Sequence, residues 1–215
     1  MAFDLTTGPG LVQAVAKTLI REDLLDEPGL IASWVRMAET QLQTSLRLNR
    51  MVKRSTATIS DAYTVLPPDL LEIKSIHINT PSGYQRYLGY AAPEDLQDIR
   101  RSFPNGGAPE KFSIIGTQIE LGPDPVESAQ IELTYYAALP ALDCTTPGAT
   151  NWLLQLAPHL YLYSTLCNSA PFLQEDERLQ VWLPLAQQAL TSLNEADYKS
   201  TYGGSRLTMK GRTFG

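Results

Sequence analysis

Residues 151–198 read NWLLQLAPHLYLYSTLCNSAPFLQEDERLQVWLPLAQQALTSLNEADY. Apolar residues recur there at helical spacing in two groups: Leu156, Leu160, Tyr163 and Cys167, then Leu179, Trp182, Ala186, Ala189, Leu190 and Leu193. Pro171 is expected to stop the first helix, and the polar residues 174–177 suit the positive end of the second helix dipole. The stretch therefore predicts two helices folded back on each other through a short turn.

Two more prolines refine this helix pair. Pro158 has no N–H to donate, so it fits best as the first residue of a helix starting near Ala157, with residues 151–155 forming a separate turn. Pro184 lies inside the second stripe and predicts a kink near residues 180–183. The aromatic residues of the stretch are interpreted as core packing: Trp152, Tyr161, Tyr163 and Trp182.

The N-terminal part predicts two further helices, over residues 11–25 and 30–49, separated by Glu27-Pro28-Gly29. The longer one carries a strong apolar stripe: Ile31, Trp34, Val35, Ala38, Leu42, Leu46 and Leu48. Glu39 lies beside that stripe. It is either a solvated helix residue or a polar contact to the C-terminal helix pair.

From Ser55 onward, apolar residues recur at every second position instead of at helical spacing, and this alternation is typical of strands. One strand is expected to contain Ile59, Tyr63 and Val65 and to end at Leu66-Pro67-Pro68-Asp69, because proline cannot donate ladder hydrogen bonds. Asp69 is expected to accept backbone N–H bonds in that turn.

The following segment predicts a second strand over residues 71–78 and a short helix over 93–102 with Leu96 and Ile99 facing inward. A hairpin over 112–121 turns at Gly116-Thr117. A last strand runs from about residue 129 to 139. The predicted fold class is α+β, with helices on both sides of a strand-rich insert in the sequence.

The expected division places a four-helix bundle in residues 1–54 and 150–198, and an antiparallel β-rich insert, too small for a large core of its own, in 55–149. Residues 199–215 form an extended C-terminal arm with four basic residues and no acidic one. That leaves 13 basic and 23 acidic residues in 1–198, a net charge of −10. An acidic body argues against tight nucleic-acid binding.

Composition excludes several other classes of protein. The chain has no run of 18 apolar residues that would span a membrane, and its first ten residues do not form a secretory signal. The sequence signatures GxSxG, HExxH, GxxxxGK[ST] and GxGxxG do not occur. We therefore predict no catalytic residue, no cofactor and no metal site. A glycosidase needs only two carboxylates facing across a cleft, so a cell-wall glycosidase stays open as an alternative of another class.

The order of these segments resembles the head-to-tail adaptor (connector) proteins of tailed phages, of the short-tailed type. The resemblance rests on NWLL, PHLYLYSTL and ERLQVWLPLAQQAL in the C-terminal half, on the pair Ala38-Glu39, and on VLPPDLLEIKSIHI. It covers residues 10–210, nearly the whole chain. The individual motifs are short, and their order and spacing together carry the likeness.

The resemblance implies a structural protein of the virion, assembled in the host cytoplasm, and not an enzyme. By resemblance, about twelve copies form a ring that docks under the portal protein, extends the DNA channel and receives the tail nozzle protein. Genomic DNA passes through without specific binding, and no membrane is involved. A connector or head-completion protein of a long-tailed phage is the alternative among structural proteins.

The C-terminal arm is the predicted portal-binding segment. Its run Arg206, Leu207, Thr208, Met209 and Lys210 alternates basic or polar residues with apolar ones. An extended segment of this kind can lie along a groove or add to a sheet edge of a partner. By resemblance that partner is the portal. The alternative is a solvated basic tail without a partner.

Overall fold

The computed structural model describes residues 4–80, 83, 85–173 and 176–202. The chain divides into two compact units. The helical unit combines the residues up to Asn49 with those from Leu139 onward, and the β unit is Arg50–Ala138. The chain therefore leaves the helical unit once and returns to it once. No helix of the described residues is long and apolar enough to cross a membrane.

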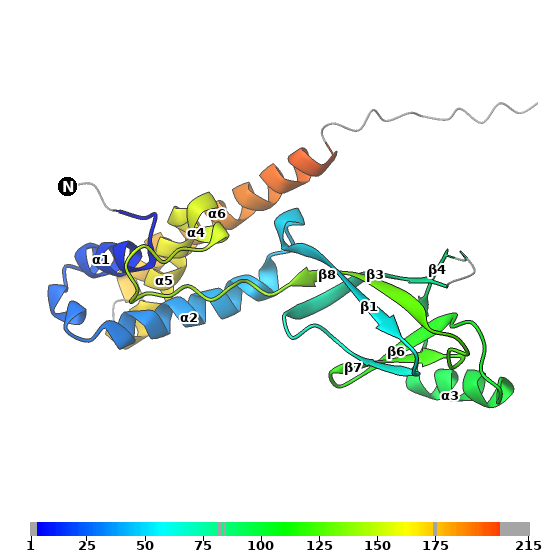
Figure 1. Cartoon of the computed structure of the whole chain (residues 1–215). Coiled ribbons are helices and arrows are strands. Elements are labelled where there is room, and N and C mark those ends of the chain that lie inside the picture. Colours follow the sequence, from blue (N-terminus) through cyan, green and yellow to red (C-terminus); the bar gives the residue numbers. More distant parts are fainter. Residues whose placement is uncertain (1–3, 81–82, 84, 174–175, 203–215) are drawn as a thin grey trace, which may run out of the picture. The chain divides into compact units, whose positions relative to one another are not determined.

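The helical unit contains α1 (Gly8–Leu19), the short 3-10 helix η1 (Glu22–Leu25), α2 (Pro28–Ser45), α4 (Trp152–Leu156), α5 (Pro158–Leu173) and α6 (Asp176–Tyr202). The helix α5 packs against α1, α2 and α6 (Figure 1). Pro158 begins α5 and α4 precedes it as a separate turn, which confirms the interpretation of this proline. The helix α6 runs through Pro184, and its start at Asp176 agrees with the acidic first turn.

Two predictions for α5 are wrong. Pro171 does not stop the helix, which continues to Leu173, because a proline in the last turn removes only one hydrogen bond. The expected stripe is also not the buried face, since Leu156 is 41% exposed and lies in α4. The buried side chains of α5 are Leu160, Tyr161, Leu162, Ser164, Thr165, Leu166, Ser169 and Ala170. A helix packed against α1, α2, α4 and α6 is buried on most sides, so no single stripe describes it.

The N-terminal helices follow the prediction with shifted ends. Every residue of the stripe predicted for α2 is buried, although the helix ends at Ser45. The helix predicted over 11–25 breaks at Ile20, which has a left-handed backbone (φ 58°). There the N–H groups of Ile20 and Arg21 bond the carbonyls of Lys17 and Ala16 and close the last turn of α1.

The β unit holds eight strands among its described residues, in two four-stranded sheets (Figure 1). Sheet A has the order β1 (Val52–Ile59), β8 (Ala129–Ala137), β3 (Leu70–Asn79) and β4 (Gln85–Tyr87). Sheet B has the order β2 (Tyr63–Val65), β7 (Gln118–Gly122), β6 (Lys111–Ile115) and β5 (Gly89–Tyr90). A second 3-10 turn, η2 (Asn49–Met51), leads into β1. The pair β5–β6 is parallel and the other pairs are antiparallel, so the insert is not purely antiparallel.

The strand predicted to contain Ile59, Tyr63 and Val65 is two strands in different sheets. The chain leaves β1 after Ile59, passes residues 60–62 and enters β2 of the other sheet. Asp69 also has side-chain partners that were not expected, since its oxygens accept from Lys53 Nζ (2.7 Å) and Tyr135 Oη (2.9 Å). The hydrogen bond from Lys53 is the main cause of its lowered pKa. This contact joins β1, β8 and the loop before β3.

The β unit has a hydrophobic core of its own, contrary to expectation. The core lies between the sheets and contains Ile59, Ile76, Ile78, Leu88, Phe112, Ile119, Leu121, Ala129, Ile131, Leu133, Tyr135 and Ala137. Two sheets packed face to face enclose apolar residues that a single small sheet would leave exposed. The predicted hairpin is β6–β7, and Gly116 has the positive φ (59°) expected of its turn.

The helix α3 (Pro93–Ser102) covers the outer face of sheet B, away from this core. Leu96 of α3 is fully buried, as predicted, and fills the space over Gly122, where a Cβ would lie 2.8 Å from Leu96 Cδ1. The β unit therefore has three layers: sheet A, sheet B and α3.

Candidate functional site

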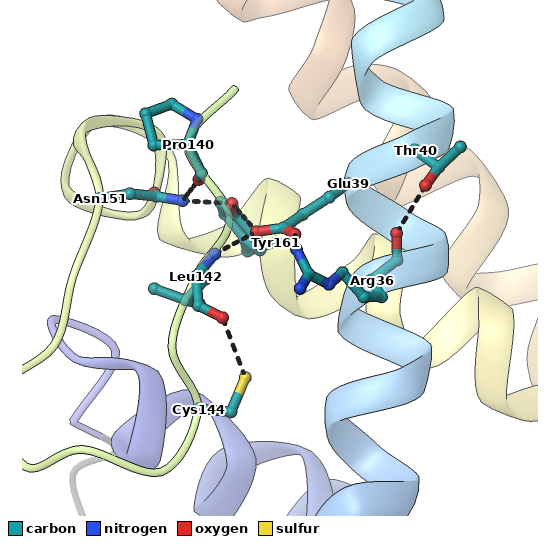
Figure 2. Close-up of polar contacts among 8 residues, drawn as sticks. All are labelled: Arg36, Glu39, Thr40, Pro140, Leu142, Cys144, Asn151 and Tyr161. Atoms are coloured by element: carbon teal, nitrogen blue, oxygen red, sulfur yellow. Dashed lines mark hydrogen bonds and ion pairs between the residues drawn. The ribbon is translucent and has the colours of Figure 1, made fainter. Parts of the chain in front are cut away.

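Glu39 is the centre of a buried polar cluster in the helical unit. It projects from α2 and is only 2% exposed (Figure 2). Its Oε1 accepts from the backbone N–H of Leu142 (2.7 Å) and from Tyr161 Oη (2.9 Å). The cluster thus joins α2, the segment after Leu139 and α5. Of the two readings of Glu39, the structure supports the polar contact to the C-terminal helices.

Asn151 extends the cluster to the start of α4. Its Nδ2 donates to Tyr161 Oη (2.6 Å) and to the carbonyl of Pro140 (3.0 Å), while its Oδ1 accepts from Leu154 N (2.9 Å) as the helix cap. Tyr161 therefore accepts one hydrogen bond and donates one. Sequence reasoning assigned Tyr161 to the core but missed Asn151, although an asparagine directly before a helix is a known cap signal.

Burial shifts the pKa values of this cluster. Desolvation raises the pKa of Glu39 above its usual value, and the hydrogen bonds from Leu142 and Tyr161 oppose the shift. Desolvation also raises the pKa of Tyr161, and that of the Cys144 thiol to about 11. Arg36 Nη1 lies 3.9 Å from Glu39 Oε2, and its side chain is mostly exposed. This weak ion pair leaves Oε2 able to carry a proton without disturbing the bonds to Oε1.

The segment from Leu139 to Thr150 is held against the helices by further contacts. Gly8 N–H donates to the carbonyl of Ala149 (2.7 Å), and a Cβ on Gly8 would lie 2.0 Å from the carbonyl oxygen of Asp143. Asp143 accepts four hydrogen bonds from Thr145 and Thr146, and these lower its pKa. The cluster around Glu39 holds the segment that returns from the β unit against α2 and α5.

A second polar cluster lies under α3 in the β unit. Arg100 Nη1 bonds Glu120 Oε1 of β7 and Tyr63 Oη of β2 (2.7 Å). Arg100 Nε bonds the carbonyl of Leu121 (3.1 Å) and Asp124 Oδ1 (2.6 Å), and the guanidinium lies 4.7 Å from the centre of the Tyr63 ring. Sequence reasoning missed this cluster, because only the pairing of β2, β7 and α3 brings its members together.

Large apolar side chains are exposed on both units. In the β unit, Val65 of β2 (70% exposed) and Ile115 of β6 (50%) flank Gln118 of β7 in one cross-strand row. In the helical unit, Phe172 is 62% and Val181 is 60% exposed. Exposed apolar residues of this size are candidates for contacts with other proteins. The predicted portal-binding residues, Arg206 to Lys210, lie outside the described residues.

One known protein family matches nearly the whole chain. The profile of the SU10 adaptor protein family matches residues 6–209, which spans both units. The chain belongs to the SU10 adaptor protein family. Among curated proteins, none matches the chain.

Membership of the SU10 adaptor protein family confirms the resemblance to phage head-to-tail adaptors. It gives this adaptor a structural role in a virion. The two polar clusters fit that role, since each one fixes an element of the scaffold: the return segment of the chain in one case, α3 in the other.

Proposed function

We propose that this protein is a head-to-tail adaptor that docks as a ring under the portal, extends the DNA channel and provides the attachment site of the tail nozzle. The observation that carries the proposal is the family match over residues 6–209. The match includes α1 to α6, both sheets and four of the five residues assigned to portal binding. The proposed adaptor function therefore rests on both units of the chain and not on one of them.

Each part of the chain has a proposed role. The helices α1, α2, α5 and α6 act as a four-helix bundle that forms the ring, with about twelve copies related by a head-to-tail interface. The β unit offers a second surface, supported by the exposed row of Val65 and Ile115. The C-terminal arm, 199–215, contacts the portal through Arg206, Leu207, Thr208, Met209 and Lys210. The helix α6 extends to Tyr202, so the first four residues of the arm are helical.

Truncation after Tyr202 tests the arm. The shortened protein should keep its melting temperature, because the removed residues follow the end of α6, and should bind purified portal protein far more weakly. Binding is measured by co-sedimentation with portal rings. The matched control is a full-length chain in which residues 203–215 are shuffled, which keeps the basic charge and removes the order. If the truncated protein binds the portal as tightly as the full chain, the assignment of the arm is wrong.

Particles assembled without the protein test the function itself. Electron microscopy should show heads that lack tails, and some of these heads should have lost their DNA, because the channel is not extended and the nozzle has no attachment site. Normal tailed particles without this protein would refute the adaptor function. A zymogram on host cell wall addresses the glycosidase alternative, and a cleared zone there would also count against the proposal.

A further inference from the structure

Three polar side-chain atoms under α3 have no hydrogen-bond partner among the described residues: Ser113 Oγ, Glu120 Oε2 and Arg100 Nη2. Ser113 and Glu120 are 0% and 1% exposed, so bulk water does not reach them. Buried polar groups in folded proteins are nearly always paired, either with protein groups or with ordered water. Three unpaired atoms in one place therefore point to a bound molecule.

The strand register and the Arg100–Glu120 ion pair bring these three side chains together. Ser113 of β6 lies directly opposite Glu120 of β7. Directly paired residues have Cβ atoms about 4.5–5.5 Å apart on the same face of the sheet. Arg100 reaches the same carboxylate from α3, through Nη1 to Oε1. The guanidinium thus meets the carboxylate through one nitrogen, and not through two parallel bonds, which leaves Nη2 and Oε2 for another partner.

The chemistry of the three atoms selects the ligand. Nη2 only donates, Oε2 of an ionised carboxylate only accepts, and the Ser113 hydroxyl does either. A metal ion would face the guanidinium of Arg100, and an anion would face the carboxylates of Glu120 and Asp124, whose Oδ1 lies 2.6 Å from Arg100 Nε. A small neutral molecule that both donates and accepts satisfies all three atoms.

We propose that one water molecule is bound between α3 and sheet B, accepting from Arg100 Nη2 and donating to Glu120 Oε2 and Ser113 Oγ. Buried waters commonly make about three hydrogen bonds to groups that lack other partners. The water completes the polar attachment of α3, next to the apolar contact of Leu96 with Gly122. It is a structural component of the β unit.

Magnetic cross-relaxation between water and backbone amides tests the site in 15N-labelled full-length protein. The wild type should show long-lived water contacts at the amides of Ser113 and Glu120. Absence of such contacts would overturn the proposal. A high-resolution crystal structure with Ser113 Oγ bonded directly to Glu120 Oε2 would do the same.

Two substitutions of Ser113 sharpen the test. Ser113→Val fills the space of the water with methyl groups, so the water contact should be lost and the urea midpoint should fall. Ser113→Asn places an amide there, whose oxygen accepts from Arg100 and whose nitrogen donates to Glu120, so the contact should be lost while the midpoint recovers. Thr58→Val on the exposed part of β1 is the control for strand propensity. Equal urea midpoints for the valine and asparagine variants would contradict the proposal. If neither variant folds, the water–amide cross-relaxation of the wild type decides.

Discussion

Glu39 occupies a position where a charged carboxylate is costly, and its neighbours offset that cost with two hydrogen bonds. Glu39→Gln keeps an oxygen that accepts from Leu142 and Tyr161, so the free energy of unfolding should change little. Glu39→Ala leaves both donors unpaired and should lower it by about 2–6 kcal/mol, at about 1–3 kcal/mol for each buried group. Urea denaturation measures both variants. A glutamine variant as unstable as the alanine variant would show that the charge, and not the hydrogen bonding, matters.

The raised pKa of Glu39 predicts a dependence of stability on pH. Below the ordinary value of 4.5 the group is neutral in both the folded and the unfolded state. As the pH rises above 4.5, the unfolded chain loses the proton first, so the stability contributed by the protonated group decreases until the folded pKa is passed. The wild type should therefore lose stability relative to Glu39→Gln as the pH rises from 4.5. If the stability of the wild type relative to Glu39→Gln stays constant or increases over this range, the predicted direction is wrong.

Ile20 gives a prediction about the end of a helix. A β-branched residue with φ 58° is strained, and its side chain is 78% exposed, so few contacts offset the strain. Ile20→Gly should raise the free energy of unfolding by about 1 kcal/mol, because glycine adopts this conformation freely and αL costs other residues about 1–2 kcal/mol. Ile20→Ala keeps a Cβ and serves as the control. A glycine variant no more stable than the alanine variant would contradict the backbone strain inferred at this position.

The same elements show how far the sequence predicts the fold. The stripe of α2 was predictable because this helix buries one face, whereas α5 packs against α1, α2, α4 and α6 and buries serine and threonine with its apolar residues. The break between β1 and β2 was not predictable, because the chain changes sheets at residues 60–62 without a glycine or proline. The end of α1 was missed for a similar reason, since Ile20 occupies a position that glycine usually takes.

The two polar clusters differ in how far the sequence predicted them. A polar contact from Glu39 to the C-terminal helices was one of two interpretations of this residue, because Glu39 lies beside the apolar stripe of α2. Its partner Leu142 contributes a backbone N–H, which any residue supplies, so no sequence signal pointed to it. Arg100 and Glu120 belong to different elements, and their pairing depends on the tertiary packing of α3 on sheet B.

At the scale of the whole molecule, the net charge predicts how the protein interacts with duplex DNA. Residues 1–198 carry a net charge of −10. An acidic surface repels phosphates and lets a duplex pass without sticking. Gel-shift assays at physiological salt should therefore show no retained duplex DNA. A truncated chain ending at Tyr202 is the control for the basic arm, and a tight, salt-sensitive complex with the truncated chain would contradict the prediction.

The discontinuous helical unit has a consequence for synthesis on the ribosome. The helix α2 leaves the exit tunnel with its apolar stripe uncovered, and its partner α5 follows only after the whole β unit. At about 5–20 residues per second, the 128 residues after Ser45, up to and including Leu173, take roughly 6–26 s. All the strands that form the core of the β unit are synthesised within that time, because the unit is one continuous segment of the chain. Nascent chains that stop before α5 therefore carry a folded β unit beside an uncovered α2, a surface that chaperones and proteases of the host recognise.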